Sequence, residues 1–350
     1  MKLIKYKLGD LIRQRRQKND SNDLPICGVT RDGFIPPKQQ DADTSLYNVF
    51  YLKDFVFNPA RMELNAIVFN DRYEKAICSS LYEVFYVHRP EVILPEYLAL
   101  LVKQDWFTRY CEFMGSGSAR EYCRVANISE LEIEVPPIEF QAEMARDNQI
   151  IRDRIELKRR INDNLEATAQ ALYQELFVDN PDISEWKSGC VGDVLQLQRG
   201  HDLPRTEMLG GEYPVAGSTG TIGYHNQYTA ESPVIVMGRS GNIGNPRLYL
   251  CNCWTHNTSL YVKQIFHADP MWTYYMLKNL NYDSFVGGSA VPTLNRNDVH
   301  AYGIAIPPIE LQETFGKKVM KLIQFRETNL SEIAKLDELQ CTVLATISSR

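Results

Sequence analysis

Three short segments in the second half of the chain carry side chains suited to binding a polyanion. Residues 213–224 are rich in glycine, serine and threonine, which predicts a loop whose backbone N–H groups can approach phosphates closely. Residues 238–242 add an arginine and an amide, and residues 254–258 add an aromatic face and further donors. Arginine and asparagine can make bidentate contacts to guanine and adenine. For each segment taken alone, a tight turn between strands is a better explanation than a binding site. Because one domain contains three such segments and the other domain has counterparts, a nucleic-acid interface becomes equally plausible.

The candidate DNA-binding residues are arginines, small hydroxyls, asparagines and one histidine in these segments and in their counterparts in the first half. An arginine-rich cluster near the N-terminus is included, although a solvated charged turn explains it equally well. The full set is Arg13, Arg15, Arg16, Arg31, Arg61, Ser79, Ser80, Ser116, Ser118, Arg120, Arg199, Ser218, Thr219, Arg239, Ser240, Asn242, His256, Asn257, Ser289 and Thr293.

The sequence lacks the residue patterns of catalytic sites that act on nucleic acids. It contains neither the Asn/Asp-Pro-Pro-Tyr pattern of amino-methyltransferases nor the Gly-x-x-x-x-Gly-Lys-Ser/Thr phosphate loop. Cys251, Cys253 and His256 could supply three metal ligands, but no second Cys/His pair completes a set of four, so buried strand cysteines are the better explanation. We therefore expect no catalytic residue and no metal site in this chain.

A repeated six-residue motif organises the elements that must position these side chains. Residues 136–141 (Pro-Pro-Ile-Glu-Phe-Gln) recur as residues 307–312 (Pro-Pro-Ile-Glu-Leu-Gln), at an offset of 171 positions. Each copy opens a segment of about forty residues without proline, in which apolar residues recur at three- and four-residue steps. This pattern predicts a long amphipathic helix after each diproline. Self-similarity at one fixed offset indicates a duplicated unit.

Two long helices with one apolar stripe each bury those stripes most simply against each other. At about 1.5 Å per residue, forty residues span about 60 Å, which exceeds the face of a compact domain. We expect an antiparallel coiled coil, with the alternative that each helix packs on its own domain. The residues expected in the helix pair or in partner docking are Ile151, Ile155, Ile161, Leu165, Leu172, Leu322, Leu336, Val343 and Ile347.

Two similar domains alternate with the two helices, and the predicted fold class is α+β (mixed α/β) with a pseudo-two-fold internal repeat. In the first domain, β-branched and aromatic runs predict strands, and apolar spacing predicts one helix from Pro95 to Phe113. The predicted strands lie near residues 49–52, 55–57, 66–69 and 82–87. The expected boundaries are 1–137 for the first domain, 138–180 for the first helix, 181–186 for a linker, 187–308 for the second domain and 309–350 for the second helix.

The composition favours a cytoplasmic protein that does not associate with membranes. The 350 residues are 44% hydrophobic, and no apolar run approaches the ~18 residues of a membrane span. The net charge is −6, with most of the excess acid between residues 138 and 186, so either domain can still present a basic face. Eight scattered cysteines and a start without the apolar region of a signal peptide favour reduced thiols in the cytoplasm.

The whole chain resembles the specificity subunit of a type I restriction–modification enzyme. The resemblance rests on the two copies of Pro-Pro-x-Glu-x-Gln and on three segments of the second domain, residues 213–224, 235–244 and 288–296. The first domain departs from the family pattern, since residues 58–61 (Asn-Pro-Ala-Arg) stand where a Gly-Arg loop is expected. Residues 115–120 stand for the loop before its last strand.

This resemblance implies a non-catalytic DNA-binding subunit of a methyltransferase and restriction complex. Each target-recognition domain would recognise one half of a bipartite, asymmetric DNA sequence, and the helix pair would fix the gap between the halves. The helices would also dock two methyltransferase subunits, which bring S-adenosylmethionine and methylate adenine. A motor-nuclease restriction subunit would complete the complex, and the chain itself would bind no cofactor.

Two other assignments remain open at this stage. The chain could be the specificity component of a restriction enzyme whose nuclease and methyltransferase are fused, because neighbouring genes rather than this sequence distinguish the two. It could also belong to a different class, a coiled-coil scaffold whose domains bind protein or glycan.

Overall fold

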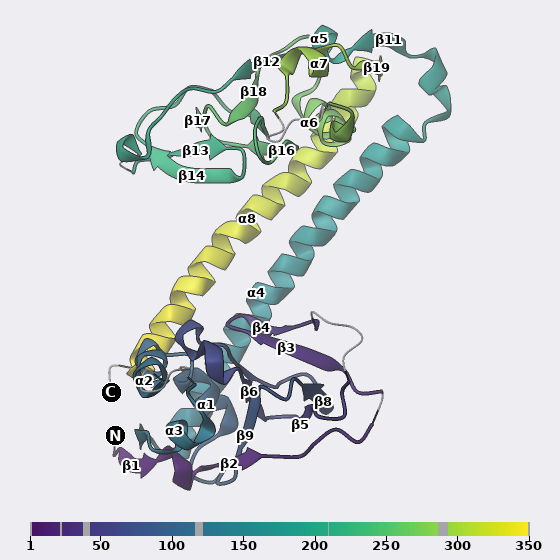
Figure 1. Cartoon of the computed structure of the whole chain (residues 1–350). Coiled ribbons are helices and arrows are strands. Elements are labelled where there is room, and N and C mark those ends of the chain that lie inside the picture. Colours follow the sequence, from purple (N-terminus) through teal and green to yellow (C-terminus); the bar gives the residue numbers. More distant parts are fainter. Residues whose placement is uncertain are drawn as a thin grey trace. The chain divides into compact units, whose positions relative to one another are not determined.

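The computed structural model describes residues 2–21, 23–37, 43–115, 122–208, 210–285 and 293–348 (Figure 1). The chain divides into two compact units, residues 1–157 with 332–350 and residues 158–331. Each unit contains one α+β domain and part of each long helix. The first unit therefore combines the beginning and the end of the chain.

The first domain is built from two four-stranded sheets and one strand pair. In the strand pair, β1 (Ile4–Lys7) runs antiparallel to β10 (Glu132–Val135). One sheet has the order β2 (Ile12–Arg15), β9 (Glu83–Val87), β6 (Phe55–Phe57), β7 (Ile67–Phe69). The other has the order β4 (Gly33–Ile35), β3 (Ile26–Thr30), β8 (Lys75–Cys78), β5 (Asn48–Tyr51). The predicted strands are confirmed as β5, β6, β7 and β9, and the other strands before β10 were not predicted.

The described part of the first domain also contains the short helices α1 (Pro95–Leu101), α2 (Asp105–Gly115) and α3 (Val125–Ser129). The prediction of one helix from Pro95 to Phe113 was wrong, because the chain turns between α1 and α2. There the carbonyl oxygen of Val102 accepts a hydrogen bond from Asn65 Nδ2 (2.8 Å). Lys103 Nζ donates to the carbonyl oxygens of Arg31 (2.8 Å) and Ile67 (2.7 Å). These long-range hydrogen bonds stabilise a turn where local periodicity predicts a continuous helix.

The second domain repeats this arrangement with fewer strands. Its strand pair is β11 (Lys187–Cys190) and β19 (Gly303–Ile306). Its four-stranded sheet has the order β12 (Leu195–Arg199), β18 (Ser259–Ile265), β15 (Val234–Gly238), β16 (Gly244–Tyr249). A smaller sheet has the order β14 (Gly220–His225), β13 (Tyr213–Gly217), β17 (Trp254–Thr255). Its helices are α5 (Val191–Val194), α6 (Pro270–Lys278) and α7 (Arg296–His300).

The two domains share one topology, which confirms the predicted duplication. In each domain the second sheet contains one parallel pair, β3–β8 or β13–β17, so β3, β4 and β8 correspond to β13, β14 and β17. One expectation was wrong. Residues 213–224 form the β13–β14 hairpin rather than a loop, and pairing of the two strands uses backbone N–H groups that we expected to be available to phosphates.

Each domain core packs a sheet face against helices. In the first domain the rings of Phe55 and Phe85, on neighbouring strands, stack with centroids 4.8 Å apart. In the second domain Trp272 and Tyr275 of α6 are fully buried, and the ring of Tyr275 meets that of Phe315 at 5.6 Å. Phe315 belongs to the second long helix, so this helix closes the core of the second domain.

The two long helices are α4 (Ile138–Tyr173) and α8 (Ile309–Ser348), and a π-helical turn (Gln174–Val178) extends α4. The glutamine of each repeated motif is buried and anchors the helix start. Gln141 Nε2 donates to the carbonyl oxygen of Pro136 (2.8 Å), and Gln312 Nε2 donates to that of Pro307 (2.8 Å). Among the described residues, no helix is apolar over a stretch long enough for a membrane span.

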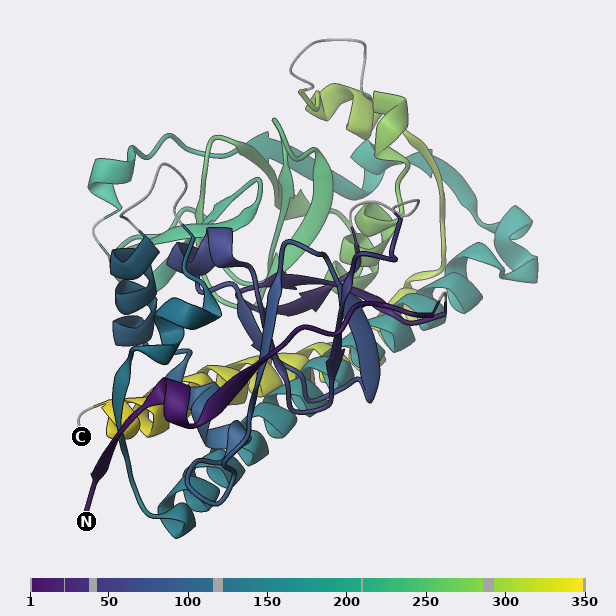
Figure 2. The same cartoon turned by 60° about the horizontal axis from the view of Figure 1, so that its bottom comes forward.

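Within the first unit, the start of α4 and the end of α8 run side by side and antiparallel (Figure 2). Ile151 and Ile155 pack against Ile333, with Leu336 and Val343 beside them. Polar contacts flank this apolar cluster, such as the one between Asn148 and Gln340 (3.0 Å). The predicted helix pairing is confirmed for this part of the chain.

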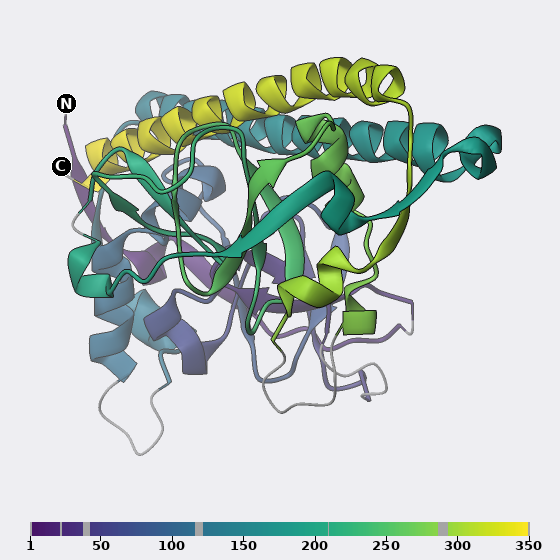
Figure 3. The same ribbon diagram turned by 90° about the horizontal axis from the view of Figure 1, so that it is seen from above.

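Within the second unit, the end of α4 and the start of α8 also run side by side and antiparallel (Figure 3). Here the pair also buries polar side chains. Asn329 Nδ2 donates to Asn162 Oδ1 (2.9 Å), and both side chains are buried. Ile161 and Leu165, which we expected to be in the stripe, are only partly buried. The apolar pattern therefore misplaced the contact face by one position, because Asn162 occupies it.

The alternative in which each helix packs on its own domain is partly correct, since Met144 of α4 packs against the first core and Leu322 of α8 against the second. The opposite helix ends pack on the domain of the other helix. Ile347 lies in the core of the first domain, and Leu172 packs against the core of the second. The ends of each helix therefore pack against the domain cores, while residues nearer the middle of each helix contact the other long helix.

Candidate nucleic-acid interface

Three connections of the second domain lie in mutual contact. They are the β13–β14 turn (218–219), the β15–β16 loop (239–243) and the β17–β18 turn (256–258). The amide of Ser218 donates to Thr258 Oγ1 (3.3 Å), and its carbonyl oxygen accepts from Asn242 Nδ2 (3.1 Å). The amide of Arg239 donates to the carbonyl oxygen of Thr258 (3.0 Å). The three segments that the sequence singled out therefore form one surface.

A fourth segment joins this surface at the β15–β16 loop. The amide of Leu294 donates to the carbonyl oxygen of Arg239 (2.7 Å), and Ser240 and Thr293 form an isolated β-bridge. Ser289 lies outside the described residues. The predicted residues that the structure brings together here are Ser218, Thr219, Arg239, Ser240, Asn242 and Thr293.

Glycine is required where the β15–β16 loop folds back on its own strand. A Cβ atom on Gly238 would lie 1.5 Å from the carbonyl oxygen of Asn242, a distance that no side chain tolerates. Gly241 (φ +78°) and Gly244 (φ +71°) have left-handed backbone conformations that favour glycine. The glycines therefore give this loop a compact shape that presents the side chains of its other residues.

His256 and Asn257 are engaged within the second domain. His256 Nε2 lies 3.3 Å from the carbonyl oxygen of Leu203, and Nδ1 lies 3.0 Å from Thr258 Oγ1. Because a carbonyl oxygen can only accept, Nε2 carries the proton and Nδ1 accepts from the hydroxyl. Asn257 Nδ2 donates to Asp202. These contacts indicate that His256 shapes the β17–β18 turn.

The first domain presents the same four segments. They are the β3–β4 turn (31–32), the β6–β7 loop (58–66), the β8–β9 turn (79–82) and residues 122–124. One cavity of about 470 Å³ is lined by β3 up to Thr30, next to the first of these segments, and by residues of the second and third, including Asn58, Arg61, Ser79 and Tyr82. The amide of Cys123 donates to the carbonyl oxygen of Pro59 (3.0 Å), as Leu294 does to Arg239 in the second domain. Ser80 is exposed beside Ser79, and Ser116, Ser118 and Arg120 lie outside the described residues.

The arginine-rich cluster lies on β2 and its end rather than on a turn. Arg15 is held inside the domain, because its Nε and Nη2 donate to Asp54 Oδ2 (2.6 Å) and Oδ1 (3.0 Å). Its guanidinium lies 4.8 Å from the ring centroid of Tyr51. The last residue of β12 is Arg199, which is exposed and meets Asp202 at 3.5 Å. The other arginines of this domain's predicted set that the structure describes are exposed: Arg13, Arg16, Arg31 and Arg61.

Two residues near this surface were not predicted from the sequence. Leu81 is 78% exposed at the tip of the β8–β9 turn, where its amide donates to Ser79 Oγ (3.3 Å). Lys103 lines a second cavity of about 540 Å³ together with Arg31 and Arg61. Burial of the Lys103 ammonium, and then the charge of Arg31, lower the pKa of Lys103 to about 8. A leucine in a turn and a lysine inside a predicted helix carry no signal in the sequence alone.

The cysteines near the surface do not form a ligand set. Cys253 is buried, whereas Cys251 is exposed, so the expectation of buried strand cysteines is correct for Cys253 alone. Across the residues that the structure describes, His, Cys, Asp and Glu side chains form no group of three or more that could hold a metal ion. The chemistry of this surface is therefore that of hydrogen-bond donors and cations.

Two proteins with similar sequences are specificity subunits of type I restriction enzymes. The chain is 23% identical over 221 residues to the type I restriction enzyme HindI specificity subunit of Haemophilus influenzae, a match that covers 60% of this chain and 48% of that protein. It is 26% identical over 132 residues to the type I restriction enzyme MjaIX specificity subunit of Methanocaldococcus jannaschii, which covers 33% and 31%. The matched part thus spans about half the length of the first relative and about a third of the length of the second.

A solved structure has the same fold. The crystal structure of the S subunit of a type I restriction–modification system from M. genitalium matches 99% of this chain and 96% of its own, with a TM-score of 0.69 and 16% identity. A family model described as the type I restriction modification DNA specificity domain matches residues 5–167 and 183–340, one stretch for each half of the repeat. The chain belongs to the family of type I restriction–modification DNA specificity domains.

Proposed function

We propose that this chain is the DNA-specificity subunit of a type I restriction–modification complex, in which each domain recognises one half of a bipartite, asymmetric target. The observation that carries the proposal is the convergence of the same four segments in both domains, with different side chains in each. Equivalent backbone positions with unlike side chains suit two unlike half-sites.

Arg239 is the side chain best placed to contact DNA in the second domain, because Asn242 is engaged within its own loop. The backbone amide and carbonyl of Arg239 are both hydrogen-bonded within the domain, so its guanidinium extends from a fixed position. Asn242 Nδ2 is used by Ser218, and its Oδ1 accepts from Asn245 Nδ2 (2.9 Å). Arg239 therefore serves as the principal base or phosphate contact, and Asn242 supports the loop.

The partners proposed for the chain are DNA, two methyltransferase subunits and a motor-nuclease subunit. The net charge of −6 supports shared phosphate contacts, because such an acidic chain gains little from long-range attraction to DNA. Exposed apolar residues along the long helices support protein docking there: Ile150, Leu157, Phe325, Leu330 and Leu339. S-adenosylmethionine would enter through the methyltransferase, adenine would be the methylated base, and this chain would contribute no catalytic group. We place the complex in the cytoplasm, where cysteines remain reduced.

The first experiment selects duplexes from a random-sequence pool with the full chain bound to its methyltransferase partner. We expect the selected DNA to share two unlike half-sites separated by a constant gap. A single contiguous site, or enrichment without a shared sequence, would refute bipartite recognition. No enrichment over the methyltransferase alone would support a scaffold role instead.

Substituting Arg239 by alanine tests the second domain directly. If Arg239 contacts a base edge, binding weakens by ~1–3 kcal/mol and preference relaxes at one position of one half-site. If it contacts a phosphate, binding to all DNA sequences weakens, and the salt dependence of binding falls by about one released counterion. Lys187→Ala removes an exposed cation from β11, in the separate strand pair, and serves as the control. Equal binding by both variants and the unmodified chain would remove Arg239 from the site.

A further inference from the structure

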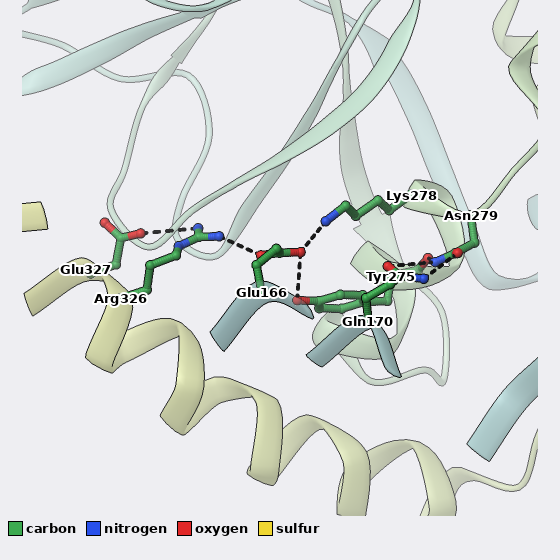
Figure 4. Close-up of polar contacts among 7 residues, drawn as sticks. All are labelled: Glu166, Gln170, Tyr275, Lys278, Asn279, Arg326 and Glu327. Atoms are coloured by element: carbon green, nitrogen blue, oxygen red, sulfur yellow. Dashed lines mark hydrogen bonds and ion pairs between the residues drawn. The ribbon is translucent and has the colours of Figure 1, made fainter. Parts of the chain in front are cut away.

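One carboxylate in the second unit gathers donors from two other elements. Glu166 of α4 accepts from Arg326 Nη1 of α8 at Oε2 (2.7 Å) and from Lys278 and Tyr275 of α6 at Oε1, the latter at 3.3 Å (Figure 4). The side chains of Glu166, Lys278 and Arg326 are each about 70% buried, with exposed fractions of 28%, 32% and 24%. We call Glu166, Tyr275, Lys278 and Arg326 the Glu166 cluster.

Neighbouring contacts extend the cluster along α4. One turn further on, Gln170 Nε2 donates to Asn279 Oδ1 (2.6 Å), just beyond the end of α6. The ammonium of Lys278 lies 5.5 Å from the ring centroid of Tyr275. Burial first, and then the charge of Glu166, raise the pKa of Tyr275, so its hydroxyl keeps its proton and donates. The cluster therefore joins a domain helix to both long helices through charge-assisted hydrogen bonds.

The first unit has no equivalent cluster at the corresponding positions. The motif glutamines set the correspondence of α4 and α8, which places Asp337 at the position of Glu166 and Ile155 at that of Arg326. Asp337 is exposed, and Ile155 packs in the apolar cluster. α1 and α6 both begin with a proline, which aligns Lys103 with Lys278. Lys103 donates to two backbone carbonyls of its own domain instead.

The Glu166 cluster gives the second domain a charged attachment to both long helices, whereas the charged contact of the first domain with α4, Arg152 with Asp71 (3.4 Å), reaches one helix and is more exposed. Apolar contacts tolerate small rotations and shifts, whereas hydrogen bonds to one carboxylate weaken steeply outside narrow limits of distance and angle. A shift of α4 by a single residue would move Glu166 by about 1.5 Å and turn it by about 100°. Three donors on two other helices cannot follow such a movement together.

We propose that Glu166 is a positioning residue that fixes the second domain on the helix pair and so restricts the spacer length that the complex accepts. The inference rests on the proposed function. Adding one base pair to the spacer moves a half-site by about 3.4 Å and rotates it by about 35°. A domain held by the Glu166 cluster resists that rotation, whereas a domain held by apolar packing alone can follow it.

The experiment uses the full chain with its methyltransferase partner and three duplexes that differ only in spacer length: the selected length, one base pair fewer and one more. The unmodified complex should prefer the selected length. We expect Glu166→Gln to reduce this preference by about tenfold, because the carboxylate charge that orders the donors is lost. Arg326→Ala should act in the same direction. Asp337→Asn, at the equivalent position of the first unit, should leave the preference unchanged.

The outcomes separate the inference from the function on which it rests. If the unmodified complex binds none of the duplexes, the proposed function fails. If it prefers one spacer and Glu166→Gln keeps that preference, the inference is overturned. A loss of affinity that is equal for all three spacers would also overturn it, because that result means that Glu166 only stabilises the fold. Substitutions within either half-site should cost the variant and the unmodified complex the same.

Discussion

At the end of β2 in the first domain, Arg15 forms a buried ion pair, whereas at the end of β12 in the second domain, Arg199 forms an exposed one. The turn after β8 presents Leu81, whereas the turn after β17 presents Asn257. The order of the first sheet, the parallel pair of the second sheet and the motif glutamines are nevertheless the same in both. The repeat therefore preserves the backbone and the starts of the long helices. The charge and polarity of the surface turns differ, and so do the polar contacts between each domain and the helices. Such a division suits one scaffold that presents two different recognition surfaces.

The two ion pairs provide the largest expected difference. Asp54 is 2% exposed and accepts two hydrogen bonds from Arg15, so Asp54→Ala leaves a guanidinium between aromatic rings without its carboxylate. We expect a loss of about 3 kcal/mol in unfolding free energy of the first domain. Asp202→Ala, the matched change at the exposed pair, should cost less than about 1 kcal/mol. Urea unfolding of the full chain, monitored by amide exchange in each domain, measures both. Equal costs would mean that burial does not distinguish these pairs.

The motif glutamines should differ by a smaller amount. Gln141 makes three hydrogen bonds, with the amide of Leu94 and the carbonyl oxygens of Val92 and Pro136. Gln312 makes two that the structure records, with Asp269 and Pro307. Each alanine substitution leaves buried backbone groups unpaired and should cost about 1–3 kcal/mol. We expect Gln141→Ala to cost about 1 kcal/mol more than Gln312→Ala.

Comparing the unfolding midpoints of these two variants tests the difference. The exposed Gln149→Ala serves as the control, because Gln149 donates its hydrogen bond to Asp153 on the same helix. A larger cost at position 312 would contradict the contact-based order and would show that the second domain depends more strongly on its helix start.

The architecture was predictable because its signals are local in the sequence. A diproline followed by an apolar-periodic segment specifies a helix start, and its recurrence at a fixed offset specifies the duplication. Strands β5, β6, β7 and β9 were found because β-branched and aromatic residues cluster there. The surface of the second domain was located because its glycines and donors lie in three compact segments.

The failures arose where long-range contacts decide the outcome. Asn162 and Asn329 occupy buried helix positions because they hydrogen-bond to each other, and no apolar pattern marks such a pair. The ion pair of Arg15 was not predicted, because its partner Asp54 lies 39 positions away in the sequence. The turn at Val102 depends on Asn65, which lies 37 positions away. Residue periodicity does not encode which distant side chain will satisfy a given polar group.

The smallest expected difference depends on pH. In α7, His300 Nε2 accepts from the amide of Leu197 (2.9 Å), which requires the neutral ring. Burial, and then the charge of Arg296, lower the pKa of His300 below its ordinary value. The unfolded chain therefore binds more protons than the folded chain as the pH falls below about 6.5. The contribution of His300 to stability is complete above that pH and is lost as the pH falls through the folded-state pKa.

The first domain has Ser129 at the equivalent position, and its hydroxyl donates to the carbonyl oxygen of Val125 (2.8 Å) without titrating. We therefore expect acidification from about pH 7 to pH 5 to destabilise the second domain more than the first. Other groups titrate in both domains, so the informative quantity is the difference between the unmodified chain and His300→Gln. The variant keeps an acceptor for the amide of Leu197 but has no ring that can bind a proton. The stability of its second domain should therefore depend less on pH. Identical profiles would assign the acid sensitivity to other groups.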